Sequence, residues 1–199
     1  RFSLGCLPKE EFPIIEIENL NLEFSIDSQV FLKLIEKTRF AISNEETRYF
    51  LNGIYFHKKS LDNKQYLSMV ATDGHRLAKI DYSSKENLPE IPGVIIPKKT
   101  INELCKLLAD FTGTIEINLD PNKIIFFVNN SVLVSKLIDG NFPDYEKVIP
   151  NNNTNILTVD RNDFSMAVDR VSTIINERSP AIKFKLLKNL MNISSVNSE

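Results

Sequence analysis

The chain has 199 residues, of which 42% are hydrophobic and 25% charged, values that fit a globular protein of one or two domains with a sizeable core. Its formal net charge of −2 excludes a protein that binds nucleic acid tightly over its whole surface, so any DNA contact must be loose or come from a local basic face. Two distant cysteines and two histidines, without a CxxC pair, argue against structural zinc and fit free thiols in a reducing cytoplasm.

The start of the chain is predicted to belong to an upstream domain. The sequence opens at Arg1 without a methionine, which indicates a fragment. Residues 2–7 are expected to form the last strand of a preceding domain, and residues 8–19 a connector. No signal peptide precedes them, and no apolar run approaches the ~20 residues that a membrane-spanning helix needs.

A short strand followed by an amphipathic helix occurs twice, at a constant offset of 133 residues from Ile26 to Val159. The first copy is predicted as a strand at 24–27 and a helix at 28–42, because apolar residues recur there at helical spacing. The second copy is a strand at 157–160 and a helix at 161–175. The repeat indicates duplicated domains, because its period is too long for a solenoid.

The two helices are expected to begin in the same way. Asp27 and Asp160 stand immediately before them, where a carboxylate accepts hydrogen bonds from free backbone amides and favours the helix dipole. Both residues are therefore predicted N-caps.

Between the two copies the same order of elements returns. Turn formers such as Asp73-Gly74 and Asn129-Asn130 separate runs of strand character. Strands are predicted at 51–57, 65–71, 75–82, 94–96, 115–119, 124–128 and 132–138, and a second helix through 101–108. This predicts an α+β fold made of strand-helix-three-strand units, with helices on one face of antiparallel sheets. The complete domain spans 20–150, and 151–199 begins the next domain.

Three segments carry a resemblance to a known family: RYFLNG at 48–53, ATDGHRLA at 71–78 and KLIDGNFPDY at 136–145. In order and spacing they resemble the bacterial DNA sliding clamp, the beta subunit of DNA polymerase III. The resemblance implies three similar domains per subunit and a ring of two subunits around duplex DNA. It makes residues 1–19 the end of domain one, 20–150 domain two and 151–199 the incomplete start of domain three.

The strand after the Asp73-Gly74 turn places Leu77, Lys79 and Asp81 on one face, so Leu77 is an apolar residue on a polar face. Periodicity alone favours packing of Leu77 against a neighbouring loop, whereas the resemblance implies a hydrophobic pocket for a short linear peptide motif. The family often has Arg where this chain has Lys147, which keeps the charge but weakens a bidentate contact. The resemblance implies these pocket positions: Leu51, Thr72, Gly74, His75, Arg76, Leu77, Pro143, Lys147 and Val148.

Basic side chains on the polar faces of the helices are the candidates for DNA contact. From the residues alone they are solvated faces, but the resemblance implies helices that line the central hole and attract phosphates without reading bases. Tyr49 is a candidate for stacking on unpaired bases. The implied DNA-facing residues are Lys33, Lys37, Arg48, Tyr49, Lys98, Lys99, Arg161 and Arg170.

The resemblance implies a non-catalytic processivity factor of a DNA-directed DNA polymerase holoenzyme, a nucleotidyltransferase, located in the cytoplasm and needing no metal or cofactor. The implied partners are the polymerase III catalytic subunit, the clamp loader, other clamp-motif proteins and, in the full-length form, a second copy. Two alternatives remain open: a metal-dependent hydrolase using Asp73 and His75, and an interaction module unrelated to DNA. Neither a GxSxG elbow nor a Gly-rich phosphate loop supports catalysis, and Asp73 is expected to bond its own turn backbone.

Overall fold

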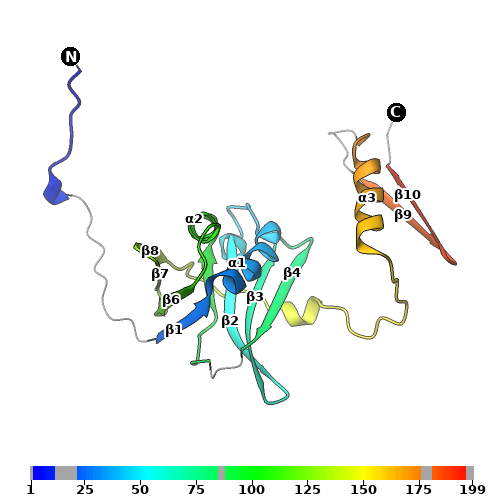
Figure 1. Cartoon of the computed structure of the whole chain (residues 1–199), viewed down its shortest axis with the longest axis horizontal. Helices are drawn as coiled ribbons and strands as arrows, with labels where there is room; N and C mark the ends of the chain where they lie inside the picture. The colour runs from blue at the N-terminus through cyan, green and yellow to red at the C-terminus, as the bar shows by residue number, and fades with distance from the viewer. Residues whose placement is uncertain (1, 12–21, 85–87, 176–180, 196–199) are drawn as a thin grey trace. The chain divides into compact units, whose positions relative to one another are not determined.

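A computed structural model describes residues 2–11, 22–84, 88–175 and 181–195, and Figure 1 shows their elements. The chain divides into two compact units between Tyr145 and Glu146, whereas the boundary predicted from the sequence lies at Pro150. Residues 2–8 do not form the predicted strand, and only a 3-10 turn, η1 (Lys9–Glu11), precedes residue 12.

The first unit repeats one order of elements, as the sequence predicted. Its first half consists of β1 (Leu22–Asp27), α1 (Ser28–Glu36), β2 (Gly53–Leu61), β3 (Lys64–Thr72) and β4 (Leu77–Ser83). Its second half consists of β5 (Val94–Pro97), α2 (Lys98–Leu108), β6 (Thr114–Leu119), β7 (Lys123–Val128) and β8 (Ser131–Lys136). Each half is a strand, a helix and three strands, which confirms the predicted plan.

The two halves exchange their first strands. One antiparallel sheet has the order β1-β6-β7-β8 and the other β4-β3-β2-β5, so β1 pairs with the second half and β5 with the first. Phe24 lies opposite Ile117, and Tyr55 lies opposite Ile95. Neither half can therefore complete its sheet alone, and the unit must fold as a whole.

One aromatic side chain of α1 joins the two sheets in the core. Phe31 is fully buried, and its ring centroid lies 5.9 Å from that of Phe56 on β2 and 5.9 Å from that of Phe126 on β7. Burial of a whole Phe side chain stabilises a fold by about 1.5–3 kcal/mol. The helices α1 and α2 contact each other and strands of the sheets, and their apolar faces enter this core.

The first helix begins as predicted and ends earlier. The Asp27 carboxylate accepts a hydrogen bond from the amide of Val30 at 2.9 Å, which confirms the N-cap. The helix was expected to reach residue 42 but stops at Glu36, because the buried Thr38 hydroxyl donates to the carbonyl of Leu34 at 2.9 Å and the chain tightens into η2 (Arg39–Ala41).

Two predicted strand starts are also corrected. Leu51 lies in η3 (Tyr49–Leu51), and β2 begins only at Gly53. His75 and Arg76 lie in the turn before β4, because their backbone amides donate to the Asp73 side chain instead of a strand partner.

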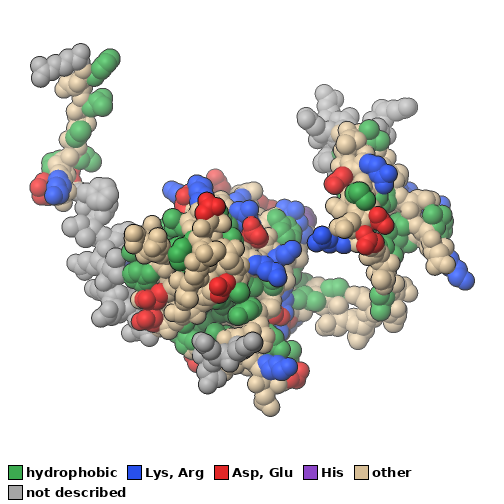
Figure 2. All heavy atoms as spheres, in the orientation of Figure 1, with side chains coloured by type: hydrophobic (Ala, Val, Ile, Leu, Met, Phe, Trp, Pro, Cys, Tyr) green, Lys and Arg blue, Asp and Glu red, His purple; other side chains and the backbone are tan. Residues whose placement is uncertain are grey.

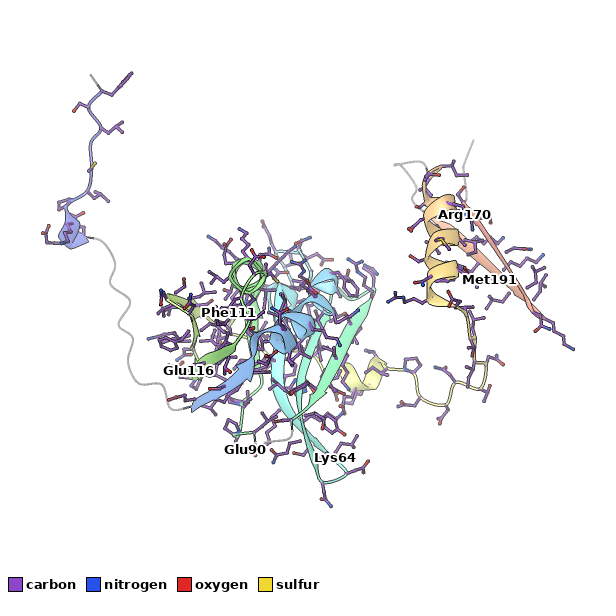
Figure 3. All side chains as sticks on the ribbon, in the orientation of Figure 1. Lys64, Glu90, Phe111, Glu116, Arg170 and Met191 are labelled. Atoms are coloured by element: carbon purple, nitrogen blue, oxygen red, sulfur yellow. The ribbon has the colours of Figure 1, made fainter. Side chains whose placement is uncertain are left out.

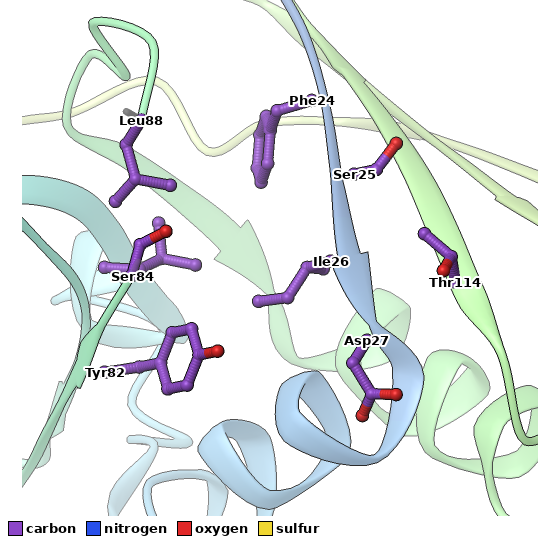
Figure 4. Close-up of a pocket in the computed structure, with 9 residues that line it drawn as sticks. Phe24, Ser25, Ile26, Asp27, Tyr82, Ser84, Leu88 and Thr114 are labelled. Atoms are coloured by element: carbon purple, nitrogen blue, oxygen red, sulfur yellow. The ribbon is translucent and has the colours of Figure 1, made fainter. Parts of the chain in front are cut away.

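The edge strands of the two sheets leave a hollow between them. Phe24 and Ile26 of β1 point toward Tyr82 of β4 and Leu88, around a cavity of about 330 Å³ (Figure 4). Ser25, Ser84 and Thr114 also line this cavity. The sheets are thus joined by the core and not by hydrogen bonds between β1 and β4.

The second unit contains η4 (Tyr145–Val148, shared with the end of the first unit), α3 (Arg161–Ser172) and a hairpin of β9 (Ile182–Leu187) and β10 (Leu190–Ser195). The Asp160 carboxylate accepts from the amides of Asn162 and Asp163 at 2.8 and 2.9 Å, which confirms the second N-cap. Met191 of β10 faces α3 (Figure 3). The Phe164 ring stacks on the Phe184 ring, with centroids 5.8 Å apart.

Residues 157–159 do not form the strand predicted for the second copy. In the first unit the equivalent strand, β1, obtains its hydrogen bonds from β6. Residues 157–159 pair with no strand among the residues that the structure describes. The helix α3 likewise ends at Ser172, before the predicted residue 175.

Candidate functional site

The turn between β3 and β4 is built around the side chain of Asp73. Its Oδ1 accepts from the backbone amides of His75 and Arg76, both at 3.0 Å, and its Oδ2 pairs with Nε of Arg76 at 3.0 Å. These hydrogen bonds, the backbone ones above all, lower the pKa of Asp73 to about 2. The carboxylate is therefore ionised and committed to the turn, as the sequence predicted.

Thr72 and Gly74 complete the turn. The Thr72 hydroxyl donates to the carbonyl of Arg76 at 2.7 Å and accepts from the amide of Gly74 at 3.1 Å. Gly74 has φ +88°, a left-handed conformation that glycine adopts without steric cost. The turn thus holds a fixed shape and presents His75 and Arg76 outward.

Arg48 supports the same turn from the loop before β2. Its Nη2 donates to the carbonyl of Asp73 at 3.1 Å, while its Nε and Nη2 pair with the Glu45 carboxylate at 2.8 and 2.5 Å. The hydrogen bond from Arg48 lowers the pKa of Glu45. A Cβ added to Gly74 would lie 2.5 Å from Nη1 of Arg48, so the two residues are closely fitted. The Arg48 side chain was predicted to face DNA, and its guanidinium lies against the turn.

The predicted pocket residues differ in their exposure to solvent and do not all belong to the same compact unit. Leu51 and Thr72 are buried, Leu77 is partly exposed as expected, and the remaining members are exposed. The turn brings Thr72, Gly74, His75, Arg76 and Leu77 together. Leu51 is the last residue of η3, and η3 begins directly after Arg48, the residue that bonds to Asp73. Pro143 belongs to the first unit, whereas Lys147 and Val148 belong to the second.

An aromatic cluster anchors the segment that contains Pro143. Phe142 stacks on Tyr55 with ring centroids 4.8 Å apart and planes 3° apart, and the Tyr145 hydroxyl lies 3.0 Å from Nε2 of His57. Tyr55 and His57 themselves stack at 4.5 Å. This cluster was not predicted from the sequence, although Tyr55 and His57 alternate with the core residue Phe56 and so share the outer face of β2.

Phe40 is a second surface feature that was not predicted from the sequence. It lies in η2 and is 57% exposed, while Thr38 and Ala41 on either side are fully buried. The guanidinium carbon of Arg76 lies 5.8 Å from the centroid of the Phe40 ring. The available signal was that Phe40 falls outside the helical apolar series of residues 30–42.

Of the predicted DNA-facing lysines of the first unit, Lys33 lies on α1 and Lys37 is the C-cap that follows it, whereas Lys98 and Lys99 begin α2. The two helices contact each other. Lys33, Lys37 and Lys99 are exposed, whereas Lys98 is partly buried and donates to Oδ1 of Asn44 at 2.5 Å. Figure 2 shows basic and acidic side chains mixed on the visible face. Tyr49 is 54% exposed.

The two arginines predicted to face DNA in the second unit lie on α3. Arg161 and Arg170 are both exposed. The Nε of Arg170 donates to the carbonyl of Met166 at 3.2 Å, and Arg161 donates to the side chain of Asn162.

Within the ranges that the structure describes, no three His, Cys, Asp or Glu side chains are grouped as metal ligands. Among those same residues, no helix is both long and apolar enough to cross a membrane.

Two protein-family models match the chain and show the family to which it belongs. The family model described as DNA polymerase III beta subunit, central domain, matches residues 25–144, and that of its C-terminal domain matches residues 146–199. The chain belongs to the DNA polymerase III beta subunit family. The resemblance inferred from the three motifs is confirmed.

Curated relatives of this beta-subunit chain carry the name beta sliding clamp. That of Caulobacter vibrioides (strain NA1000 / CB15N) is 43% identical over 199 residues, which are 100% of this chain and 54% of the relative. That of Haemophilus influenzae is 35% identical over 100% of this chain and 53% of the relative. The chain thus spans about half the length of the curated relatives it matches.

Solved structures confirm the sliding-clamp fold. A Caulobacter crescentus beta sliding clamp with polyethylene glycol bound has a TM-score of 0.89 and 43% identity, covering 94% of this chain and 50% of its own. A Bartonella birtlesii sliding clamp bound to griselimycin has a TM-score of 0.86 and 42% identity, covering 100% of this chain and 57% of its own.

Proposed function

We propose that the beta-subunit protein containing this chain is a processivity factor that encircles duplex DNA and tethers the replicative polymerase. The observation that carries the proposal is the turn held by Asp73 and Arg48, which presents a partly exposed Leu77 in a chain of this family. Tethering raises the effective concentration of polymerase at the primer end without requiring tight DNA binding.

Peptide docking would take place around this turn. A partly exposed apolar side chain beside rigid polar groups suits a short linear motif, with Leu51, Thr72, Gly74, His75, Arg76, Leu77, Pro143, Lys147 and Val148 as its residues. The Bartonella birtlesii relative is described as bound to griselimycin, which supports ligand binding within the family. The partners would be the polymerase III catalytic subunit, the clamp loader and other clamp-motif proteins.

DNA contact would come from the exposed basic residues of the helices. Lys33, Lys37 and Lys99 of the first unit, with Arg161 and Arg170 of α3, would attract phosphates without reading bases. Arg48 contributes least to this role, because Glu45 and the Asp73 carbonyl already occupy its guanidinium. Tyr49 and Lys98 complete the set of proposed contacts.

The domains and assembly follow from the same proposal. Residues 1–19 would end domain one, 20–150 would form domain two and 151–199 would begin domain three of a homodimeric ring. The protein would be a non-catalytic subunit of a DNA-directed DNA polymerase, a nucleotidyltransferase, in the cytoplasm. The free thiols of Cys6 and Cys105 are compatible with such a reducing compartment.

The test is retention on circular DNA. The full-length protein is loaded by its clamp loader onto nicked circular DNA and separated by gel filtration before and after the circle is cut. Topological binding predicts co-elution with the circle and release on linearisation. Equal retention on linear DNA, or no loader-dependent retention, would contradict the ring and leave a DNA-independent interaction module as the better account.

A further inference from the structure

Phe40 lies close to Arg76 of the Asp73 turn, although only Arg76 is among the pocket residues that the family resemblance implies. Arg76 belongs to that set, whereas Phe40 comes from η2, and η2 packs against β3 and β4. The ring and the guanidinium are 5.8 Å apart, a distance at which a cation is attracted to an aromatic face. The pair therefore adds an aromatic ring and a charged group to the exposed surface beside β4, the strand that begins at Leu77.

Phe40 is held rigidly although it is exposed. The amide of Ala41 donates to the carbonyl of Thr38 at 3.0 Å, and the amide of Ile42 donates to the carbonyl of Arg39 at 3.3 Å. The Thr38 hydroxyl is bonded back to α1, and Ala41 is fully buried. An aromatic side chain on a fixed turn loses little conformational entropy when a ligand covers it, which is the property of an interface anchor.

The guanidinium of Arg76 is only partly used. Its Nε pairs with Oδ2 of Asp73, which fixes one edge of the fork, and its side chain is 60% exposed. Its Nη1 and Nη2 groups make no hydrogen bond to any residue that the structure describes. These donors are arranged to take two oxygens of one carboxylate.

We infer that Phe40 and Arg76 form a subsite for a docked peptide that carries a carboxylate next to an apolar side chain. The carboxylate is bound by the Nη groups of Arg76, and the apolar side chain covers the Phe40 ring. The inference rests on the proposed peptide docking and names one chemical feature of the peptide. Contact of the ring with the guanidinium keeps the fork oriented, so the two halves of the subsite depend on each other.

The experiment uses the full-length protein and two fluorescein-labelled clamp-binding peptides that differ only in carrying Glu or Gln next to one apolar residue. Wild type is expected to bind the Glu peptide about threefold to fivefold more tightly, the range of an exposed ion pair of up to ~1 kcal/mol. The preference should shrink at high salt. Arg76→Met should bind both peptides equally, and Arg76→Lys should show a reduced preference because lysine lacks the fork.

Phe40→Ala should weaken binding of both peptides and reduce the Glu preference, and Phe40→Leu should restore the apolar contact but not the preference. The matched control is Val132→Ala on β8, another exposed apolar side chain, which should behave as wild type.

Equal binding of the Glu and Gln peptides to wild type, with both lost in Leu77→Asp, would overturn the subsite and leave the docking site intact. Binding of neither peptide to wild type would overturn the docking proposal itself. If Phe40→Ala leaves both peptides unchanged and weakens binding of single-stranded oligonucleotide instead, the surface belongs to DNA and the inference is wrong.

Discussion

Arg48 donates through Nη2 to the carbonyl oxygen of Asp73 at 3.1 Å, which ties the loop before β2 to the turn before β4. Glu45 holds the other edge of the same guanidinium, and the space that a Cβ of Gly74 would need is occupied by Nη1. The shape of the candidate docking turn therefore depends on a residue 25 positions earlier in the chain.

Replacing Arg48 by Met should loosen the turn without unfolding the unit, because the aliphatic stem remains while the hydrogen bond to Asp73 is lost. We expect faster hydrogen exchange at the amides of Gly74, His75 and Arg76, and peptide binding weakened about threefold to tenfold, the range of a partly exposed charged hydrogen bond. Lys106→Met, which removes an exposed ion pair with Glu103, is the control and should change neither. Unchanged exchange in Arg48→Met would contradict the supporting role.

Gly74→Ala should be destabilising for two reasons that act together. The residue has φ +88°, and its new Cβ would collide with the Arg48 guanidinium. A non-glycine residue in such a conformation costs about 1–3 kcal/mol. Urea unfolding should show this loss, whereas Gly5→Ala, with no atom within 4 Å of its Cβ, should unfold as wild type. If Gly74→Ala and Gly5→Ala unfold with the same free energy, the turn accommodates the new Cβ without cost and the prediction is wrong.

The depressed pKa of Asp73, about 2 against an ordinary 3.8, makes its contribution depend on pH. A carboxyl whose pKa is lower in the folded state stabilises the protein above the unfolded pKa and loses that effect as pH falls through the folded one. The stability advantage of wild type over Asp73→Asn should thus be complete at neutral pH and decline between about pH 4 and pH 2. Urea midpoints at a series of pH values measure it, and a constant difference over that window would count against an ionised turn carboxylate.

The Tyr145 hydroxyl should stabilise the segment that carries Pro143. Tyr145→Phe removes the contact with Nε2 of His57 but keeps the ring in the cluster with Tyr55. We expect a loss of about 0.5–1.5 kcal/mol, the value of one hydrogen bond, and faster exchange over residues 139–145. Tyr49→Phe is the matched control, since its hydroxyl bonds to none of the described residues. If residues 139–145 exchange as slowly in Tyr145→Phe as in Tyr49→Phe, ring stacking alone holds the segment and the prediction is wrong.

Phe31→Ala should cost about 3–5 kcal/mol, because it opens a cavity where the two sheets meet. The loss should appear in a single transition that includes both sheets, since the halves exchange strands. Hydrogen exchange at single amides during urea unfolding can follow β1 and β5 separately, and circular dichroism can follow the unit as a whole. Two separate transitions in the first unit would contradict the interlocked core.

Local features of this fold followed from the sequence, and pairings between distant segments did not. Asp27 and Asp160 were predictable as N-caps because capping depends only on the next few residues. The partners of β1 and β5 were not, because alternation of apolar residues fixes which face of a strand is buried but not which strand lies beside it.

The candidate site divides in the same way. Asp73 and Leu77 were identifiable from the turn and the strand alternation, together with the family motifs. The role of Arg48 and the stacking of Phe142 on Tyr55 were not, because each joins segments far apart in the chain.

The most direct test of the docking turn is the affinity of the full-length protein for a fluorescein-labelled clamp-binding peptide, measured by anisotropy for wild type and Leu77→Asp. A charge placed on the apolar contact should weaken binding at least about tenfold, since a buried unpaired carboxylate is strongly unfavourable. Leu61→Asp, at the exposed tip of the β2–β3 hairpin, should bind as wild type. Binding by Leu77→Asp equal to that of wild type would contradict the account.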